Sequence, residues 1–65
     1  MNNKFSENLI NLRKQSGLRQ IDLAEKISVT QRKISYWETG KIEPNLDDLI
    51  KVSDFFGISV DELLK

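Results

Sequence analysis

The side chains best suited to chemistry stand at the start of one predicted helix, which opens with Gln31, Arg32 and Lys33. The first turn of a helix exposes unpaired N–H groups and a partial positive charge, so cations there lower its stability. A later helix follows the usual rule, because Asp47 and Asp48 stand in its first turn. A cationic first turn suits an anion such as a phosphate, which helix N-termini bind and which Arg and Lys neutralise. These residues indicate anion binding, and the alternative is an ordinary solvated charged face.

The composition argues against catalysis. The 65 residues include no cysteine and no histidine, which removes disulfides, thiolate or imidazole metal ligands and the usual general base. We therefore expect no enzyme activity, no metal and no cofactor. No apolar run approaches the roughly 20 residues of a membrane span, and the first residues do not form a signal peptide. The sequence predicts a soluble, cytoplasmic protein with no membrane partner.

The charges are unevenly distributed although they sum to zero over the chain. Residues 1–41 contain eight basic and four acidic residues, a net charge of plus four, whereas residues 42–65 contain two and six, a net charge of minus four. A basic portion of this kind points to nucleic acid as a partner. On charge alone, ordinary mixed surface charge is an equally good interpretation.

The spacing of apolar residues predicts five helices and no strand. In the third of them Ile34 and Trp37 are expected to face the core. On the fourth helix one side is expected to carry Leu46, Leu49, Ile50, Val52, Ser53 and Phe56, with Phe55 nearly opposite. The expected helices run from the cap Asn3 to Ser16, from Gln20 to Ile27, from the cap Thr30 to Thr39, from near Leu46 to Gly57, and from the cap Ser59 onward.

The second and third segments have the pattern of a helix-turn-helix, with a small residue at the crossing, a tight turn and apolar inner faces. Ala24 and Ser28 supply the small residue and the turn. At this point the chain resembles the phage repressor and Cro family, also called the XRE type. The resemblance is carried by Gly17-Leu18-Arg19-Gln20, by Tyr36-Trp37-Glu38-Thr39-Gly40-Lys41, by Pro44, and by the flanking residues 5–13 and 56–64.

The resemblance implies an all-α, compact five-helix domain of the lambda-repressor type over residues 1–65, with the helix-turn-helix at about 20–39. It implies that the helix beginning at Thr30 enters the major groove of double-stranded DNA, usually as a homodimer on a palindromic operator. The expected base contacts are Gln31, Arg32, Ser35 and Tyr36, since a Gln amide matches adenine and an Arg fork matches guanine. The expected backbone contacts are Arg19, Gln20, Thr30, Lys33, Thr39 and Lys41. A structural ion pair is implied between Arg13 and Glu38.

Two positions depart from the family pattern. Arg19 stands where the family often has a Ser or Thr cap, which forfeits about 0.5 to 2 kcal/mol but adds a cation beside the expected phosphate site. Ser28 stands where Gly is usual, at a cost of about 1 kcal/mol if the turn requires a positive φ.

The leading hypothesis is a sequence-specific, DNA-binding transcriptional regulator, a prokaryotic or phage repressor that occupies an operator. Activation through contact with RNA polymerase is an open alternative. A second hypothesis is a protein-interaction module, such as an antitoxin or anti-repressor, that uses the acidic C-terminal helices. The two differ in one respect, because only a DNA reader requires Gln31 and Arg32. The predicted dimer surface consists of Phe55, Ile58 and Val60.

Overall fold

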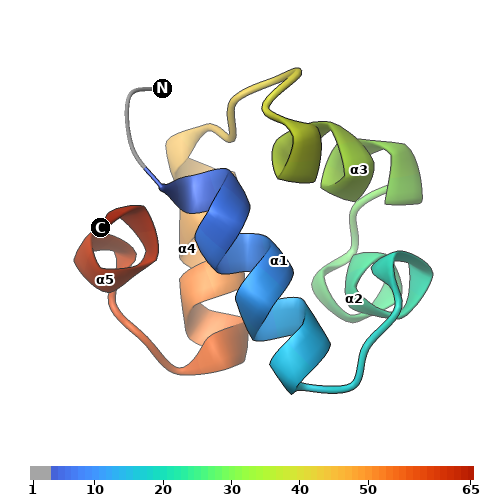
Figure 1. Ribbon diagram of the computed structural model, residues 1–65, viewed down its shortest axis with the longest axis horizontal. Coiled ribbons are helices and arrows are strands. Elements are labelled where there is room, and N and C mark those ends of the chain that lie inside the picture. The colour runs from blue at the N-terminus through green and yellow to red at the C-terminus, as the bar shows by residue number, and fades with distance from the viewer. Residues whose placement is uncertain (1–3) are drawn as a thin grey trace.

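The computed structural model describes residues 4–65, which form five α-helices. These are α1 (Phe5–Gln15), α2 (Gln20–Ile27), α3 (Gln31–Thr39), α4 (Leu46–Phe56) and α5 (Val60–Leu64). In Figure 1, α1 crosses the middle of the molecule, with α2 and α3 to its right and α5 to its left. The expected all-α, five-helix architecture is confirmed. No helix within residues 4–65 has the length and apolarity that crossing a membrane requires.

Three of the helices, α3, α4 and α5, begin at the caps that the sequence predicts. The side chains of Thr30, Asn45 and Ser59 each accept the backbone N–H three residues later, which satisfies a donor that the first turn leaves unpaired. The cap expected at Asn3 lies outside the described residues, and Lys4 occupies the cap position of α1 without a side-chain hydrogen bond. Local capping therefore fixes the starts of α3, α4 and α5.

The core lies where the inner faces of the helices meet. Its largest fully buried side chains are Trp37, Leu9, Leu23, Ile34, Leu63 and Val52. The ring of Phe5 meets Trp37 edge-on, with 6.1 Å between centroids, an arrangement that aromatic pairs favour. Because Ile34 and Trp37 both point inward, as expected, the opposite side of α3 is left outside the core.

The buried side of α4 differs from the expected one. Leu49, Val52 and Ser53 are buried, but Leu46 is 65% exposed and Ile50 is 42% exposed. At about 100° per residue, Leu46 and Ile50 lie at one edge of the predicted stripe. The helix packs on α5 and α2 through the other edge. The neighbouring helices therefore cover only part of the apolar stripe, and Leu46 and Ile50 stay exposed.

The two ends of the described chain meet beside α5. The backbone N–H of Lys4 donates to the carbonyl of Leu64 at 3.3 Å. The Asn8 amide nitrogen donates to the carbonyls of Leu63 at 2.9 Å and Lys65 at 3.0 Å. These are carbonyls that the end of a helix leaves without an intrahelical partner, so the start of α1 caps the end of α5.

Candidate nucleic-acid interface

A tight turn joins α2 to α3 and fixes the angle between them. Ser28 adopts φ 60° and ψ 46°, the left-handed conformation, and Val29 N–H donates to the Ala24 carbonyl at 2.9 Å. Ala24 is buried, and its small side chain lets the two helices approach. The turn does require a positive φ at Ser28. The cost of about 1 kcal/mol expected for a non-glycine residue there therefore applies.

The outer side of α3 carries the residues predicted to contact bases. Gln31, Arg32, Ser35 and Tyr36 fall within about 140° of the helix circumference. Gln31 and Arg32 are exposed, and their side chains make no hydrogen bond or ion pair with any residue of the range 4–65. Ser35 and Tyr36 are partly buried one turn further on. The first turn of α3 thus presents an amide and a guanidinium that are free to bind elsewhere.

The end of α3 brings three other predicted contacts together. The Lys41 ammonium lies over the Tyr36 ring, 4.6 Å from its centroid, and the Lys41 N–H donates to the Tyr36 carbonyl at 2.9 Å. Thr39 Oγ1 donates to the carbonyls of Ser35 at 3.1 Å and Tyr36 at 3.3 Å. Gly40, with φ 77°, turns the chain back after the helix. The end of α3 therefore holds Lys41 close to the aromatic ring on its outer side.

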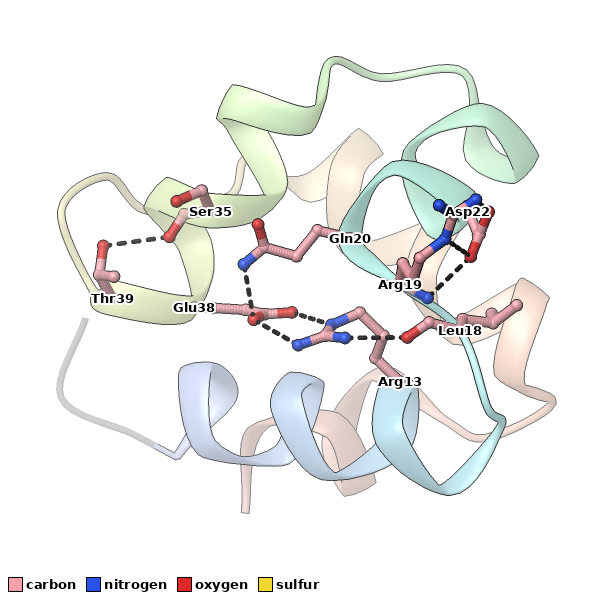
Figure 2. Close-up of polar contacts among 8 residues, drawn as sticks. All are labelled: Arg13, Leu18, Arg19, Gln20, Asp22, Ser35, Glu38 and Thr39. Atoms are coloured by element: carbon pink, nitrogen blue, oxygen red, sulfur yellow. Dashed lines mark hydrogen bonds and ion pairs between the residues drawn. The ribbon is translucent and has the colours of Figure 1, made fainter.

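Arg13 and Glu38 form the centre of a polar network between α1, α2 and α3 (Figure 2). Arg13 Nε donates to Glu38 Oε2 at 2.6 Å, and Nη2 donates to Oε1 at 3.0 Å. A further bond runs from Arg13 Nη1 to the Leu18 carbonyl at 2.8 Å. Only 11% of the Arg13 side chain and 6% of the Glu38 side chain are exposed. The hydrogen bond to Glu38 raises the pKa of Arg13, against the opposing effect of burial. The bonds between Arg13 and Glu38 link α1 to α3.

The start of α2 contains two predicted phosphate contacts whose side chains already have partners. Gln20 Nε2 donates to Glu38 Oε1 at 3.1 Å, which joins it to the central network (Figure 2). Arg19 donates Nε and Nη2 to the two oxygens of Asp22, each at 2.9 Å, and Asp22 also accepts the Arg19 backbone N–H at 2.9 Å. These bonds from Arg19 lower the pKa of Asp22 to about 2. Asp22 thereby supplies one half of a capping box, because it binds the backbone N–H of Arg19, while the Arg19 side chain accepts no bond from the first turn of α2.

Lys33 points away from the outer side of α3. Its Nζ lies 3.6 Å from Asp48 Oδ2 and 5.9 Å from the centroid of the Trp37 ring. Its backbone N–H binds the cap Thr30 at 3.1 Å, so the Thr30 hydroxyl is also engaged. The structure thus joins the first turn of α3 to α4 through Lys33 and Asp48.

Sequence reasoning missed the partners of these cations. From the sequence alone, Asp48 is expected only as a carboxylate at a helix start, and no role is predicted for Asp22. For Asp22 a local signal exists, because it stands three residues after Arg19, the spacing of the capping box. For Asp48 there is no such signal, since it is fifteen residues from Lys33 and meets it only through the fold.

The residues of the predicted dimer surface lie in different surroundings. Phe55 is 39% exposed and packs edge-on against Phe56, with 5.0 Å between ring centroids. It lines a surface hollow of about 580 Å³ beside the end of α2. Ile58 and Val60 are partly buried against the core, and Ile58 lines a second hollow, of about 330 Å³, beside α1. Of the three, Phe55 is the most available to a partner.

Metal binding finds no support in the described residues. No group of three or more acidic, cysteine or histidine side chains within residues 4–65 could hold a metal ion.

Comparisons with known proteins agree with this geometry. A helix-turn-helix family model matches residues 9–63. The chain is 44% identical over 61 residues to the HTH-type transcriptional activator BcrR of Enterococcus faecalis, covering 94% of this chain and 30% of that protein. It is 41% identical over 61 residues to the uncharacterized HTH-type transcriptional regulator YqaE of Bacillus subtilis, covering 94% of this chain and 53% of that protein. The chain thus spans about half or less of the length of these two curated relatives.

A solved structure is similar along almost its whole length. The P22 c2 repressor, crystallised with a synthetic operator, superimposes with a TM-score of 0.87 at 34% identity, covering 94% of this chain and 92% of that chain. The fold, the α2–turn–α3 unit and the sequence all agree with this match. The chain therefore belongs to the helix-turn-helix family of the XRE/Cro type, whose members are DNA-binding regulators of transcription and phage repressors.

Proposed function

We propose that this protein binds a specific double-stranded DNA sequence by placing α3 in the major groove, and that it regulates transcription from that site. The observation that carries the proposal is the first turn of α3, where Gln31 and Arg32 are exposed and make no bond to other residues of the range 4–65. Polar side chains at a helix start are usually used in caps or ion pairs, so two free ones are available to an outside partner.

The chemistry of α3 suits base recognition. The Arg32 guanidinium matches the two acceptors of guanine, and the Gln31 amide matches the donor and acceptor of adenine. Ser35 and Tyr36 lie one turn on, where they reach a further base edge, a thymine methyl or a sugar. Together these four side chains form the proposed base-reading face.

Phosphate contacts are proposed on both flanks of this face. The backbone N–H groups at the starts of α2 and α3 carry the partial positive charge that favours an anion. Arg19 is exposed and can donate to a phosphate oxygen from the N–H groups that Asp22 does not occupy. The proposed backbone contacts are Arg19, Gln20 through its main chain, Thr30, Thr39 and Lys41. The sixth residue predicted from the sequence, Lys33, is proposed as a contact only where Asp48 does not hold it.

We propose that the working form on DNA is a homodimer on a palindromic operator. One module buries only about 600 to 1,000 Å² on DNA, which limits affinity and specificity. The proposed contact between copies consists of Phe55, Ile58 and Val60, of which Phe55 is the most exposed. Occupying the operator would repress transcription, and contact with RNA polymerase would activate it. BcrR is named an activator and the P22 c2 protein a repressor, so either outcome is within the family's range.

The test is to select a preferred sequence from random double-stranded DNA. The selected site and a scrambled duplex of equal length are then titrated with the protein at two salt concentrations. A palindromic site bound far more tightly than the scramble supports the proposal and supplies the operator. Equal, weak and strongly salt-dependent binding would contradict it, because phosphate attraction alone gives that result.

A second candidate is a protein-interaction module, favoured by the apolar side chains exposed on α4. Leu46, Ile50 and Phe55 are all more than a third exposed, and residues 42–65 carry a net charge of minus four. Such a module would keep its activity without Gln31 and Arg32. Substituting both by Ala therefore separates the candidates, since DNA recognition would be lost and a protein contact through α4 would survive.

A further inference from the structure

Lys33 belongs to the first turn of α3 but not to its outer side. At about 100° per residue it lies roughly 160° from Gln31 and 100° beyond Arg32. Its ammonium is directed toward α4, 3.6 Å from Asp48, and 40% of its side chain is exposed. A helix in the major groove has phosphates along both flanks, so a flexible lysine at the flank is within reach of one when nothing else holds it.

Asp48 is a buried carboxylate with few partners. Its residue exposure is 6%. Its backbone N–H donates to Asn45 Oδ1 at 2.8 Å, while its side chain faces Lys33. A carboxylate taken out of water requires a cation or hydrogen-bond donors to remain charged. Burial of the Asp48 carboxylate therefore favours keeping the Lys33 ammonium beside it.

We infer that Asp48 is an internal counter-ion that competes with DNA phosphate for Lys33. While the pair is closed, the Lys33 charge is neutralised inside the protein and releases no counterion from DNA. Asp48 then sets the sequence-independent part of the affinity without touching DNA, because base reading stays with the outer side of α3. Asp48 is in this sense a positioning residue, and the inference rests on the proposed DNA-binding function.

Asp48→Asn is the direct test, because asparagine keeps the shape of the side chain and removes its charge. Asp47→Asn is the matched control. It removes the same charge from the neighbouring residue, which is exposed and makes no ion pair within residues 4–65. Lys33→Gln is the third variant. Each protein is first checked by thermal unfolding and then titrated with the selected site and its scramble at 50, 100 and 200 mM salt.

The inference predicts a change in salt dependence. One added phosphate contact makes the slope of log affinity against log salt steeper by about 0.9, so the advantage of Asp48→Asn over wild type falls about 3.5-fold between 50 and 200 mM. The gain is expected to be equal on the selected and scrambled duplexes, since phosphates carry no sequence. Lys33→Gln is expected to keep the wild-type slope, and combining it with Asp48→Asn is expected to cancel the gain.

Other results would overturn the inference in distinguishable ways. If wild type bound no duplex, the proposed function would fail and this role with it. If wild type bound but Asp48→Asn kept its slope or merely weakened binding, Asp48 would be structural only. An equal steepening by Asp47→Asn would assign the effect to net charge. Should Asp48→Asn not fold, Lys33→Gln decides alone, because a slope shallower by about 0.9 would mean that Lys33 already contacts phosphate.

Discussion

Gln20, in the first turn of α2, donates its side-chain amide to Oε1 of Glu38, near the end of α3, at 3.1 Å. The same oxygen accepts a bond from Arg13. With its amide engaged inside the protein, Gln20 offers a phosphate only its main chain. The bond also joins the start of α2 to the end of α3, where four of the proposed phosphate contacts lie, namely Arg19, Gln20, Thr39 and Lys41.

Glu38→Gln is expected to destabilise the fold by about 3 to 5 kcal/mol, because it leaves the Arg13 guanidinium buried without its counter-charge. Urea unfolding measures this loss. Glu25→Gln serves as the control, since Glu25 is an exposed glutamate on α2 and its substitution is expected to change stability by about 0.5 kcal/mol or less. A loss below 1 kcal/mol in Glu38→Gln would show that the network can rearrange around a neutral amide.

Arg32→Ala is expected to lose about 1 to 3 kcal/mol of binding free energy on the preferred site and to relax base choice at one position. Repeating the selection from random duplexes with this variant shows which position becomes tolerant. Lys14→Ala is the control, because it removes one exposed cation from α1 and leaves α3 intact. An equal loss on every duplex would instead identify Arg32 as a phosphate contact.

Phe55→Asp is expected to weaken operator binding without unfolding the protein, because a charge at the proposed contact opposes pairing of two copies. Sedimentation measures the oligomeric state on and off DNA, and circular dichroism checks the fold. Ile50→Asp places the same charge on another side of α4, at a residue of similar exposure. A monomeric Phe55→Asp protein that bound the operator with unchanged affinity would rule out this surface.

Ser28→Gly is expected to stabilise the protein by about 1 kcal/mol, because glycine adopts the left-handed conformation of the turn without the steric cost of a Cβ atom. The gain should appear as a raised midpoint of thermal unfolding. Ser16→Gly is the counterpart, since Ser16 has φ −84° and glycine there brings only added entropy in the unfolded chain. Equal effects of the two substitutions would show that the backbone at Ser28 carries no strain.

The Arg19–Asp22 pair predicts a pH dependence. The folded-state pKa of Asp22, about 2, lies below its ordinary value of 3.8. The pair's stabilisation is therefore complete above about pH 4 and is lost as the pH falls toward 2. Wild type should lose its thermal advantage over Asp22→Asn across that window. Arg19→Gln should keep part of the pH dependence, because the backbone N–H at position 19 still donates to Asp22. A difference between wild type and Asp22→Asn that stayed constant down to pH 2 would contradict the prediction.

Helix boundaries could be predicted from the sequence because their signals are local. Thr30, Asn45 and Ser59 each cap a helix within three residues of chain. The exposure of Leu46 and Ile50 could not be predicted in the same way. Periodicity shows which residues share a side of a helix, but the neighbours of that helix decide how much of the side is covered.

In the candidate interface, too, some features follow from local spacing and others depend on how the helices pack. The position of Gln31 and Arg32 on the outer side of α3 follows from the inward spacing of Ile34 and Trp37. The engagement of Lys33 by Asp48 depends on how α4 docks beside α3, and no sequence spacing encodes that. The roles in DNA recognition remain predictions for both kinds of residue.

The bonds between the start of α1 and the end of α5 hold the two ends of the described chain next to each other. The Asn8–Leu63 bond spans 55 positions in sequence, and Lys4 meets Leu64 directly. A short linker between the two ends would turn this most distant contact into a local one. The chain could then be opened at the exposed residues 41–43, giving a circular permutant that keeps α2, the turn and α3 in one piece.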